Sequence, residues 1–148
     1  MMKDVVISIL SRNAVGEDED SIDFVTEGLY SFDGEVACVT YLESEVTGME
    51  GTRTSLMIFA DKVVVDRDGT ITSRMIFKQG EKNAFLYDTP VGSATMHIDT
   101  RRILFRFDEQ GGELEIDYVL DLEHAFVSRN RFRLTVKEQK QTGEQSHV

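Results

Sequence analysis

Apolar and polar side chains alternate along most of this chain. From Leu114 to Leu122 every even-numbered residue is apolar, whereas four of the five odd-numbered residues from 113 to 121 are acidic. A period of two is the pattern of a half-buried β-strand, and the three-and-four spacing of an amphipathic helix is nearly absent. The chain therefore predicts an all-β protein.

Turn signals divide this pattern into about ten strands. Asp33-Gly34 and Asp68-Gly69 each suit a two-residue type I′ turn, because both central residues of that turn need a positive φ. The first turn would place Thr26 opposite Tyr41 and Tyr30 opposite Ala37. The second would place Val64, Met75 and Phe77 on one face, with Val65, Arg67 and Arg74 on the other.

The segment Ser93 to Phe107 is longer than an ordinary strand, and its apolar positions switch from even to odd near Thr100 to Arg102. A β-bulge or corner would produce this switch, and so would a tight turn between two strands. Long bent strands allow a sheet to close, and closure removes exposed edges. We predict one closed or nearly closed antiparallel β-barrel of about 8–10 strands over residues 1–137, followed by a polar tail over 138–148.

The strand after residue 125 keeps the same parity but carries basic residues at its odd positions, namely Arg129, Arg131, Arg133 and Lys137. If it pairs antiparallel with the acidic strand before it, the acidic and basic rows lie side by side on the outside. Such pairs help to set the register, because a one-residue slip would bury the charges. We interpret the arginine row as a neutralised solvent face rather than a phosphate site.

The charge balance excludes several classes of function. The 148 residues include 16 Lys and Arg against 27 Asp and Glu, for a net charge of −11, so we expect neither nucleic acid nor an anionic membrane as a partner. An acidic surface favours a basic protein partner instead. The single cysteine, Cys38, cannot form an internal disulfide, and no apolar run is long enough to cross a bilayer, so we expect a cytoplasmic protein.

The residues that could carry chemistry are few. No nucleophile motif, phosphate-binding loop or metal-ligand spacing is present, so we expect no cofactor and no metal, and we favour a non-enzymatic protein over an enzyme. Glu43 shares a face with Tyr41, and a buried carboxylate needs a partner, for which Arg53, Arg67 and Arg74 are available. Glu43 is then a polar anchor in a ligand cavity, a structural salt bridge or a residue at the barrel rim.

Short motifs at these positions resemble the YwiB-like family of small bacterial proteins, over roughly residues 3–137. They are Tyr41-x-Glu43, Gly48-Met49-Glu50-Gly51-Thr52-x-Thr54, Arg67-x-Gly69, Met75-x-Phe77 and Tyr87-x-Thr89-Pro90-x-Gly92, followed by Thr100. The resemblance implies a calycin-type, lipocalin-like barrel. It implies no established activity, ligand or catalytic residue.

Three functions compete. The first is a non-enzymatic barrel that binds a small, partly apolar molecule in its interior, because ligand pockets are mostly apolar with a few polar groups. The second is a solid-core structural or interaction module that acts through its acidic surface or a homodimer interface. The third is an enzyme that uses Glu43 with an arginine, or His97. For the first function we expect the interior to be lined by Tyr30, Val39, Tyr41, Glu43, Met75, Phe77 and Tyr87.

Overall fold

The computed structural model describes residues 2–122 and 126–139, which form an all-β protein as predicted. Within these residues the one helical element is a single 3₁₀ turn, η1 (Glu45–Thr47). None of the described residues forms a helix long and apolar enough to cross a membrane. The strands are β1 (Lys3–Val15), β2 (Asp18–Phe32), β3 (Ala37–Leu42), β4 (Thr52–Ile58), β5 (Val63–Gly69), β6 (Ser73–Phe77), β7 (Lys82–Thr89), β8 (Gly92–Asp108), β9 (Gly111–Leu122) and β10 (Phe126–Glu138).

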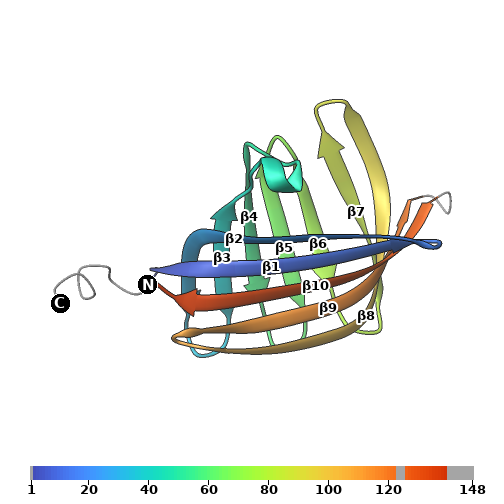
Figure 1. Cartoon of the computed structure of the whole chain (residues 1–148). Coiled ribbons are helices and arrows are strands. Elements are labelled where there is room, and N and C mark those ends of the chain that lie inside the picture. The colour runs from blue at the N-terminus through green and yellow to red at the C-terminus, as the bar shows by residue number, and fades with distance from the viewer. Residues whose placement is uncertain (1, 123–125, 140–148) are drawn as a thin grey trace.

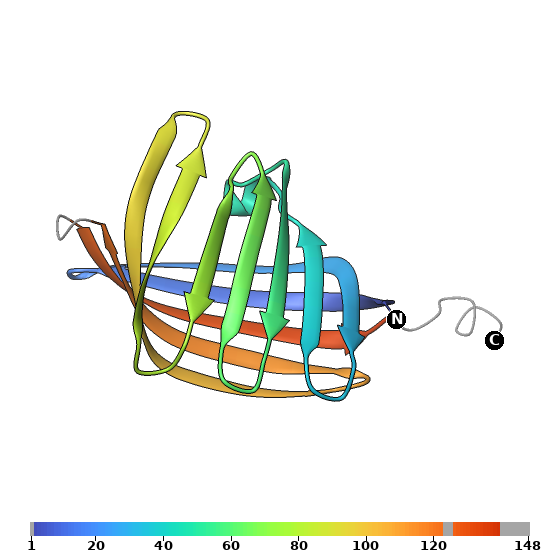
Figure 2. The same ribbon diagram turned by 180° about the vertical axis from the view of Figure 1, so that it is seen from behind.

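The ten strands form one antiparallel sheet in the order β6-β5-β4-β3-β2-β1-β10-β9-β8-β7. The sheet curls until its two edge strands, β6 and β7, are neighbours (Figure 2). One bridge joins these edges, in which Thr72 and Asp88 exchange two backbone hydrogen bonds of 3.0 Å. The prediction of a closed or nearly closed barrel is therefore confirmed.

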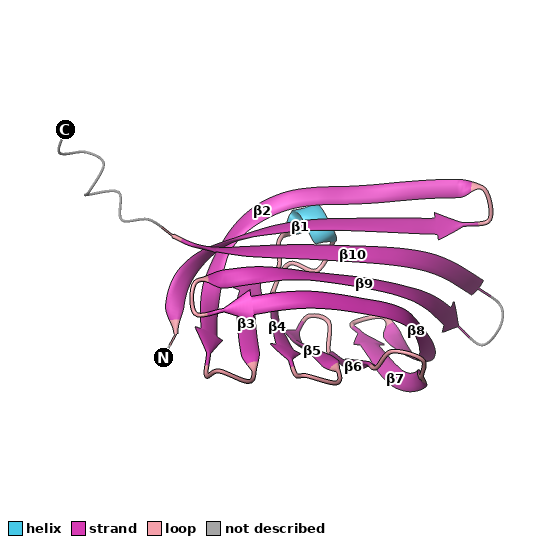
Figure 3. Ribbon diagram, turned by 90° about the horizontal axis from the view of Figure 1, so that it is seen from below, coloured by secondary structure: helices cyan, strands magenta, loops and turns pink. Residues whose placement is uncertain are grey.

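Strand length sets the shape of the barrel. The long strands β1, β2, β8, β9 and β10 run side by side as a curved wall, and the short strands β3 to β6 form the opposite wall (Figures 1 and 3). β8 is one continuous strand with a register shift between Thr100 and Arg102. A β-bulge therefore explains the predicted parity switch, and no turn divides the segment.

The core lies between the two walls, and alternation selects its residues. β1 contributes Val5, Ile7 and Ile9, which are at most 3% exposed, and β9 contributes Leu114 and Ile116 at 1% each. The two β9 positions have the parity predicted for the buried face. Their neighbours along each strand point to solvent, so one periodicity accounts for both surfaces of the wall.

The predicted pairing of acidic and basic rows is confirmed on the outside of β9 and β10. Nε of Arg131 lies 2.7 Å from Oδ1 of Asp117, and Nη2 of Arg133 lies 3.0 Å from Oε2 of Glu115. Arg129 is an exception, because the residue opposite it is Val119.

The turn at Asp33 differs from the predicted one. Gly28 lies opposite Tyr41, and Tyr30 lies opposite Val39, a shift of two residues from the expected pairs. The Asp33 carboxylate accepts hydrogen bonds from the backbone N–H groups of residues 35 and 36, at 2.8 and 2.7 Å, and so stabilises a four-residue connection. A shift of two keeps every side chain on its predicted face.

The prediction for the turn at Asp68-Gly69 was wrong in a way that changes faces. Val65 lies opposite Met75 and Arg67 opposite Ser73, so Arg67 shares the inner face with Met75 and Phe77. Gly69 is not at the turn centre but still pairs with Thr52, at a φ of +141°. A Cβ on Gly69 would overlap the carbonyl oxygen of residue 51, so glycine is needed there for close approach of two strands.

The predicted boundary at residue 137 lies close to the end of the last strand. β10 extends to Glu138, and the backbone N–H of Gln139 donates to the carbonyl oxygen of Asp4 at 3.1 Å. The rest of the predicted tail, residues 140–148, lies outside the described residues, as does the connection at 123–125.

Candidate ligand site inside the barrel

A cavity of about 60 Å³ lies inside the barrel between the short strands β3 to β6 and the long strands β9 and β10. Polar groups gather in one part of its lining, and apolar side chains form the rest. It is lined by Tyr41, Thr54, Leu56, Val65, Arg67, Met75, Phe77, Ile116, Tyr118 and Phe132.

Glu43 supports the polar part of this cavity. It follows β3 directly, and alternation places it on the inner face with Tyr41. Its side chain is fully buried, and its two carboxylate oxygens accept hydrogen bonds from the hydroxyls of Thr47, at 2.9 Å, and Thr54, at 2.5 Å. Thr47 belongs to η1, so the loop after β3 folds back to satisfy the buried charge.

Arg67 brings the opposite charge from β5. Its Nε atom lies 3.9 Å from Oε2 of Glu43, and its Nη1 lies 3.2 Å from the sulfur of Met75, which is a weak acceptor. The Nε atom is buried and has no hydrogen-bond partner among the residues that the structure describes. Nearly all buried polar groups in folded proteins form hydrogen bonds, so a buried donor without one is an unusual feature of this site.

Two tyrosines complete the polar part. Burial raises the pKa of the Tyr41 phenol, and the charge of Glu43 raises it further. Burial also raises the pKa of Tyr118, against the opposing effect of Arg67. Both phenols therefore keep their protons near neutral pH, and the Tyr41 phenol interacts with the Glu43 carboxylate. The Tyr118 ring stands edge-on to Phe77, with ring centroids 4.9 Å apart.

The cavity presents hydrogen-bond donors, and the charge of its cation is balanced by a neighbouring carboxylate. Among the residues that the structure describes, no group of three or more His, Cys, Asp or Glu side chains is placed to hold a metal ion.

The structure brings part of the predicted interior set together. Tyr41, Met75 and Phe77 line the cavity, and Glu43 contacts it through Arg67 and Thr54. The other three predicted residues, Tyr30, Val39 and Tyr87, are not among the lining side chains. Tyr30 and Val39 belong to the hydrophobic core and Tyr87 is packed against it, while the Tyr30 hydroxyl donates to the carbonyl oxygen of Asp108.

Among the three arginines considered for Glu43, Arg67 reaches it. Arg74 lies outside the barrel with its Nε 3.6 Å from Asp66, and Arg53 is an exposed residue opposite Asp68. The prediction omitted Tyr118, which lines the cavity. Its even position in the apolar row of β9 was the signal that could have identified it.

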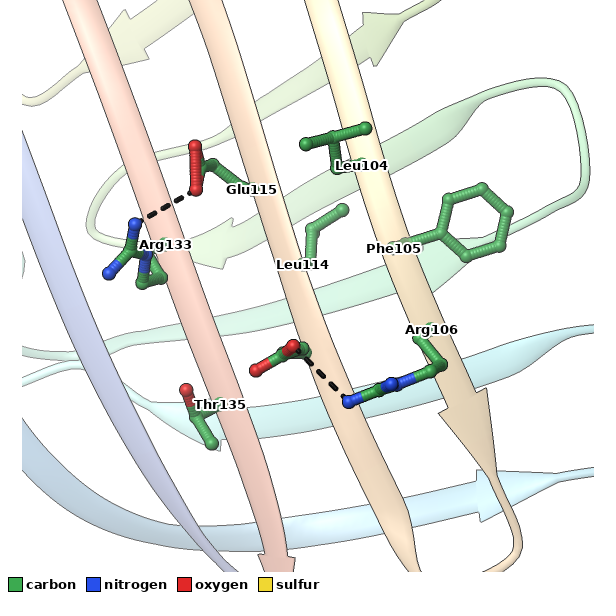
Figure 4. Close-up of a pocket in the computed structure, with 8 residues that line it drawn as sticks. Leu104, Phe105, Arg106, Leu114, Glu115, Arg133 and Thr135 are labelled. Carbon is green, nitrogen blue, oxygen red and sulfur yellow. Dashed lines mark hydrogen bonds and ion pairs between the residues drawn. The ribbon is translucent and has the colours of Figure 1, made fainter.

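A second hollow lies on the outer surface of β8, β9 and β10, with a volume of about 520 Å³ (Figure 4). Its charged side chains are matched in pairs. Nη2 of Arg106 lies 3.5 Å from Glu113, and Nη2 of Arg133 lies 3.0 Å from Glu115. These exposed pairs leave little unbalanced charge in the hollow.

Residues 7–134 match the family model described as "Domain of unknown function (DUF1934)". The chain belongs to this family. The structure is similar to the crystal structure of ywiB protein from Bacillus subtilis, with a TM-score of 0.84 and 18% sequence identity over 94% of each chain. No curated protein matches the chain significantly. The resemblance predicted from the sequence motifs is therefore confirmed, and at this identity the structural similarity establishes the fold.

Proposed function

We propose that this DUF1934 barrel binds a small, neutral, partly apolar molecule in its interior, through an oxygen atom that accepts a hydrogen bond from Arg67. The observation that carries the proposal is the buried Nε donor of Arg67, which lies 3.9 Å from the Glu43 carboxylate but has no hydrogen-bond partner among the described residues. A ligand oxygen would satisfy this donor, and leaving it unpaired costs free energy.

The charges around the cavity favour a neutral ligand. The Arg67 guanidinium already lies beside the carboxylate of Glu43, so an anion would be repelled by that carboxylate and a second cation by the guanidinium. Protonated Tyr118 adds a donor, whereas the phenol of Tyr41 interacts with Glu43. A ketone, ether or alcohol oxygen fits these groups, and the hydrocarbon part would contact the apolar lining.

The cavity limits the size of this ligand. Its volume of about 60 Å³ is well below the roughly 300–1,000 Å³ of pockets for drug-sized molecules. The ligand therefore has few heavy atoms, or it displaces a flexible side chain. Met75 is suited to such displacement because its thioether chain is unbranched and adapts to its surroundings.

Native mass spectrometry of the purified protein tests for a co-purified molecule. Cyclohexanone and cyclohexanol then serve as neutral probes in thermal-unfolding and NMR titrations, with cyclohexane as the matched compound without oxygen. We expect the oxygenated probes to raise the Tm of the parent, and Arg67→Met to abolish the difference between them and cyclohexane. Arg53→Met is the control, since Arg53 is exposed on the outside. Equal binding to Arg67→Met and the parent would refute the proposal.

A second candidate function is a structural or interaction module that acts through its acidic surface or a homodimer interface. Two observations favour it: the barrel interior is largely filled by side chains, and apolar residues such as Val25 and Leu42, each 65% exposed, remain on the surface. Sizing chromatography and pull-down at low and high salt test this function. A strictly monomeric protein without a salt-sensitive basic partner would contradict it.

A further inference from the structure

An open groove of about 460 Å³ crosses β1, β10, β9 and the bulge of β8. It lies where the β1–β2 hairpin and the adjoining parts of β9 and β10 extend past the short strands (Figure 3). Four arginines line it, against the two carboxylates of Glu19 and Asp117: Arg12, Arg101, Arg129 and Arg131. This excess of positive charge stands out in a chain whose net charge is −11.

The strand register concentrates the positive charge. Arg12 of β1 lies directly opposite Arg131 of β10, and Arg129 occupies the next position of the same face. Like charges that face each other across an antiparallel pair are destabilising. Neighbouring strands are only about 4.8 Å apart, so these guanidinium groups can converge on one bound group.

The carboxylates near the groove neutralise only some of its four arginines. Asp117 holds Arg131 through two hydrogen bonds of 2.7 and 3.3 Å, and Asp99 lies 3.1 Å from Arg101. Within residues 2–122 and 126–139, neither Arg12 nor Arg129 forms an ion pair. The residues beside Arg129 across the sheet are Ala14 and Val119, which are small and uncharged.

The hollow shown in Figure 4 lies on the same wall and can be compared with this groove. There Arg106 and Arg133 each lie beside a glutamate, so the neighbouring surface is neutralised. The alternation of acidic and basic rows thus fails at Arg129, where β9 presents Val119 instead of a carboxylate. Because Val119 stands where the other positions have a carboxylate, there is space above Ala14 and Val119 for a bound group.

We propose that this groove binds the phosphate group of a small phosphorylated molecule. Arg12 and Arg129 donate to the phosphate oxygens, and Arg131, oriented by Asp117, supplies a third guanidinium. Arginine recognises phosphate through paired N–H donors, and the groove volume lies within the roughly 300–1,000 Å³ of small-molecule sites. The negative charge of the whole chain disfavours a nucleic acid as the source of the phosphate.

Titration of the full chain with inorganic pyrophosphate at low ionic strength tests the proposal, by calorimetry and by amide NMR shifts. We expect shifts centred on residues 12–14, 117–119 and 129–131, and an affinity that falls as salt is added. Arg12→Gln and Arg129→Gln should each weaken binding by about tenfold. Arg106→Gln is the matched control, because that arginine is exposed but paired with Glu113. Citrate, titrated in parallel, should bind more weakly if the site selects phosphate over carboxylate.

Three results would overturn the proposal: no pyrophosphate binding, equal binding by the parent and both groove variants, or an equal loss in Arg106→Gln. Citrate binding as tight as pyrophosphate would refute the selection of phosphate. A salt-sensitive self-association that Arg12→Gln abolishes, without pyrophosphate binding, would instead assign the groove to the acidic hairpin of a second copy. Circular dichroism of each variant establishes that it is folded. The interior site is not altered by these substitutions, so either proposal can fail alone.

Discussion

The Nε atom of Arg67 lies 3.9 Å from Oε2 of Glu43, and the side chain of Glu43 is completely buried. Removing one partner of a buried pair leaves the other charge uncompensated, which destabilises a protein by about 3–5 kcal/mol. We expect Glu43→Gln to lower the free energy of unfolding by about 3 kcal/mol, since Arg67 retains some exposure. Urea denaturation of both proteins measures this difference.

A double-mutant cycle separates charge pairing from packing at this site. Glu43→Gln combined with Arg67→Met should lose less stability than the sum of the single variants, because the double variant contains no unpaired charge. Additive losses would mean that Glu43 and Arg67 do not interact energetically.

Gly28 lies where the barrel wall has no room for a side chain. A Cβ at this position would overlap the carbonyl oxygen of Thr40 and would lie 2.5 Å from Cδ1 of Ile7. We expect Gly28→Ala to destabilise the fold by about 1–3 kcal/mol, as overpacking does in other cores. Val25→Thr, at a 65% exposed position of the same strand, should change stability by less than about 0.5 kcal/mol. Thermal denaturation of the two variants compares them, and similar losses would contradict the steric explanation.

The buried phenol of Tyr30 predicts a loss of stability in alkali. Burial, together with the charge of Asp108, raises its pKa from 10.0 to about 12. Between these values the unfolded chain loses the proton while the folded chain keeps it, so the free energy of unfolding falls as the pH rises. Below pH 10 this contribution is fully present.

The variant Tyr30→Phe tests whether the Tyr30 phenol causes this loss of stability. The free energy of unfolding is measured for the variant and the parent from pH 7 to pH 12. At pH 7 the variant should be less stable by about 1 kcal/mol, through loss of the hydrogen bond to the Asp108 carbonyl. Above pH 10 it should lose stability less steeply than the parent. An unchanged slope would assign the alkaline transition to other groups.

The two faces of β9 should respond very differently to truncation. Leu114 is 1% exposed, and Leu114→Ala should destabilise the barrel by about 2–5 kcal/mol through lost burial and the cavity left behind. Glu113, its neighbour, forms an exposed ion pair with Arg106, so Glu113→Ala should cost less than about 1 kcal/mol. Chemical denaturation of both variants measures the contrast, and comparable losses would refute the assignment of faces.

Turn geometry was the weakest part of the prediction, because it depends on side-chain hydrogen bonds within the turn and on contacts beyond it. Asp33 uses its side chain to stabilise a longer connection, and Gly69 serves the approach of β5 to residue 51. The first difference preserved the faces. The second moved Arg67 to the inside, where it meets Glu43, and no local rule of hairpin turns contains that information.

The sequence by itself determined the all-β class, the buried parity of β9 and β10, the parity switch within residues 93–107 and the family resemblance, because each depends on residues that are close in the chain or on short motifs. Only the tertiary structure decided that Arg67 lies beside Glu43, that the cavity is small, and that Arg12 faces Arg131. These relationships join strands far apart in sequence. Their geometry depends on register and closure, which are set by the packing of the whole sheet.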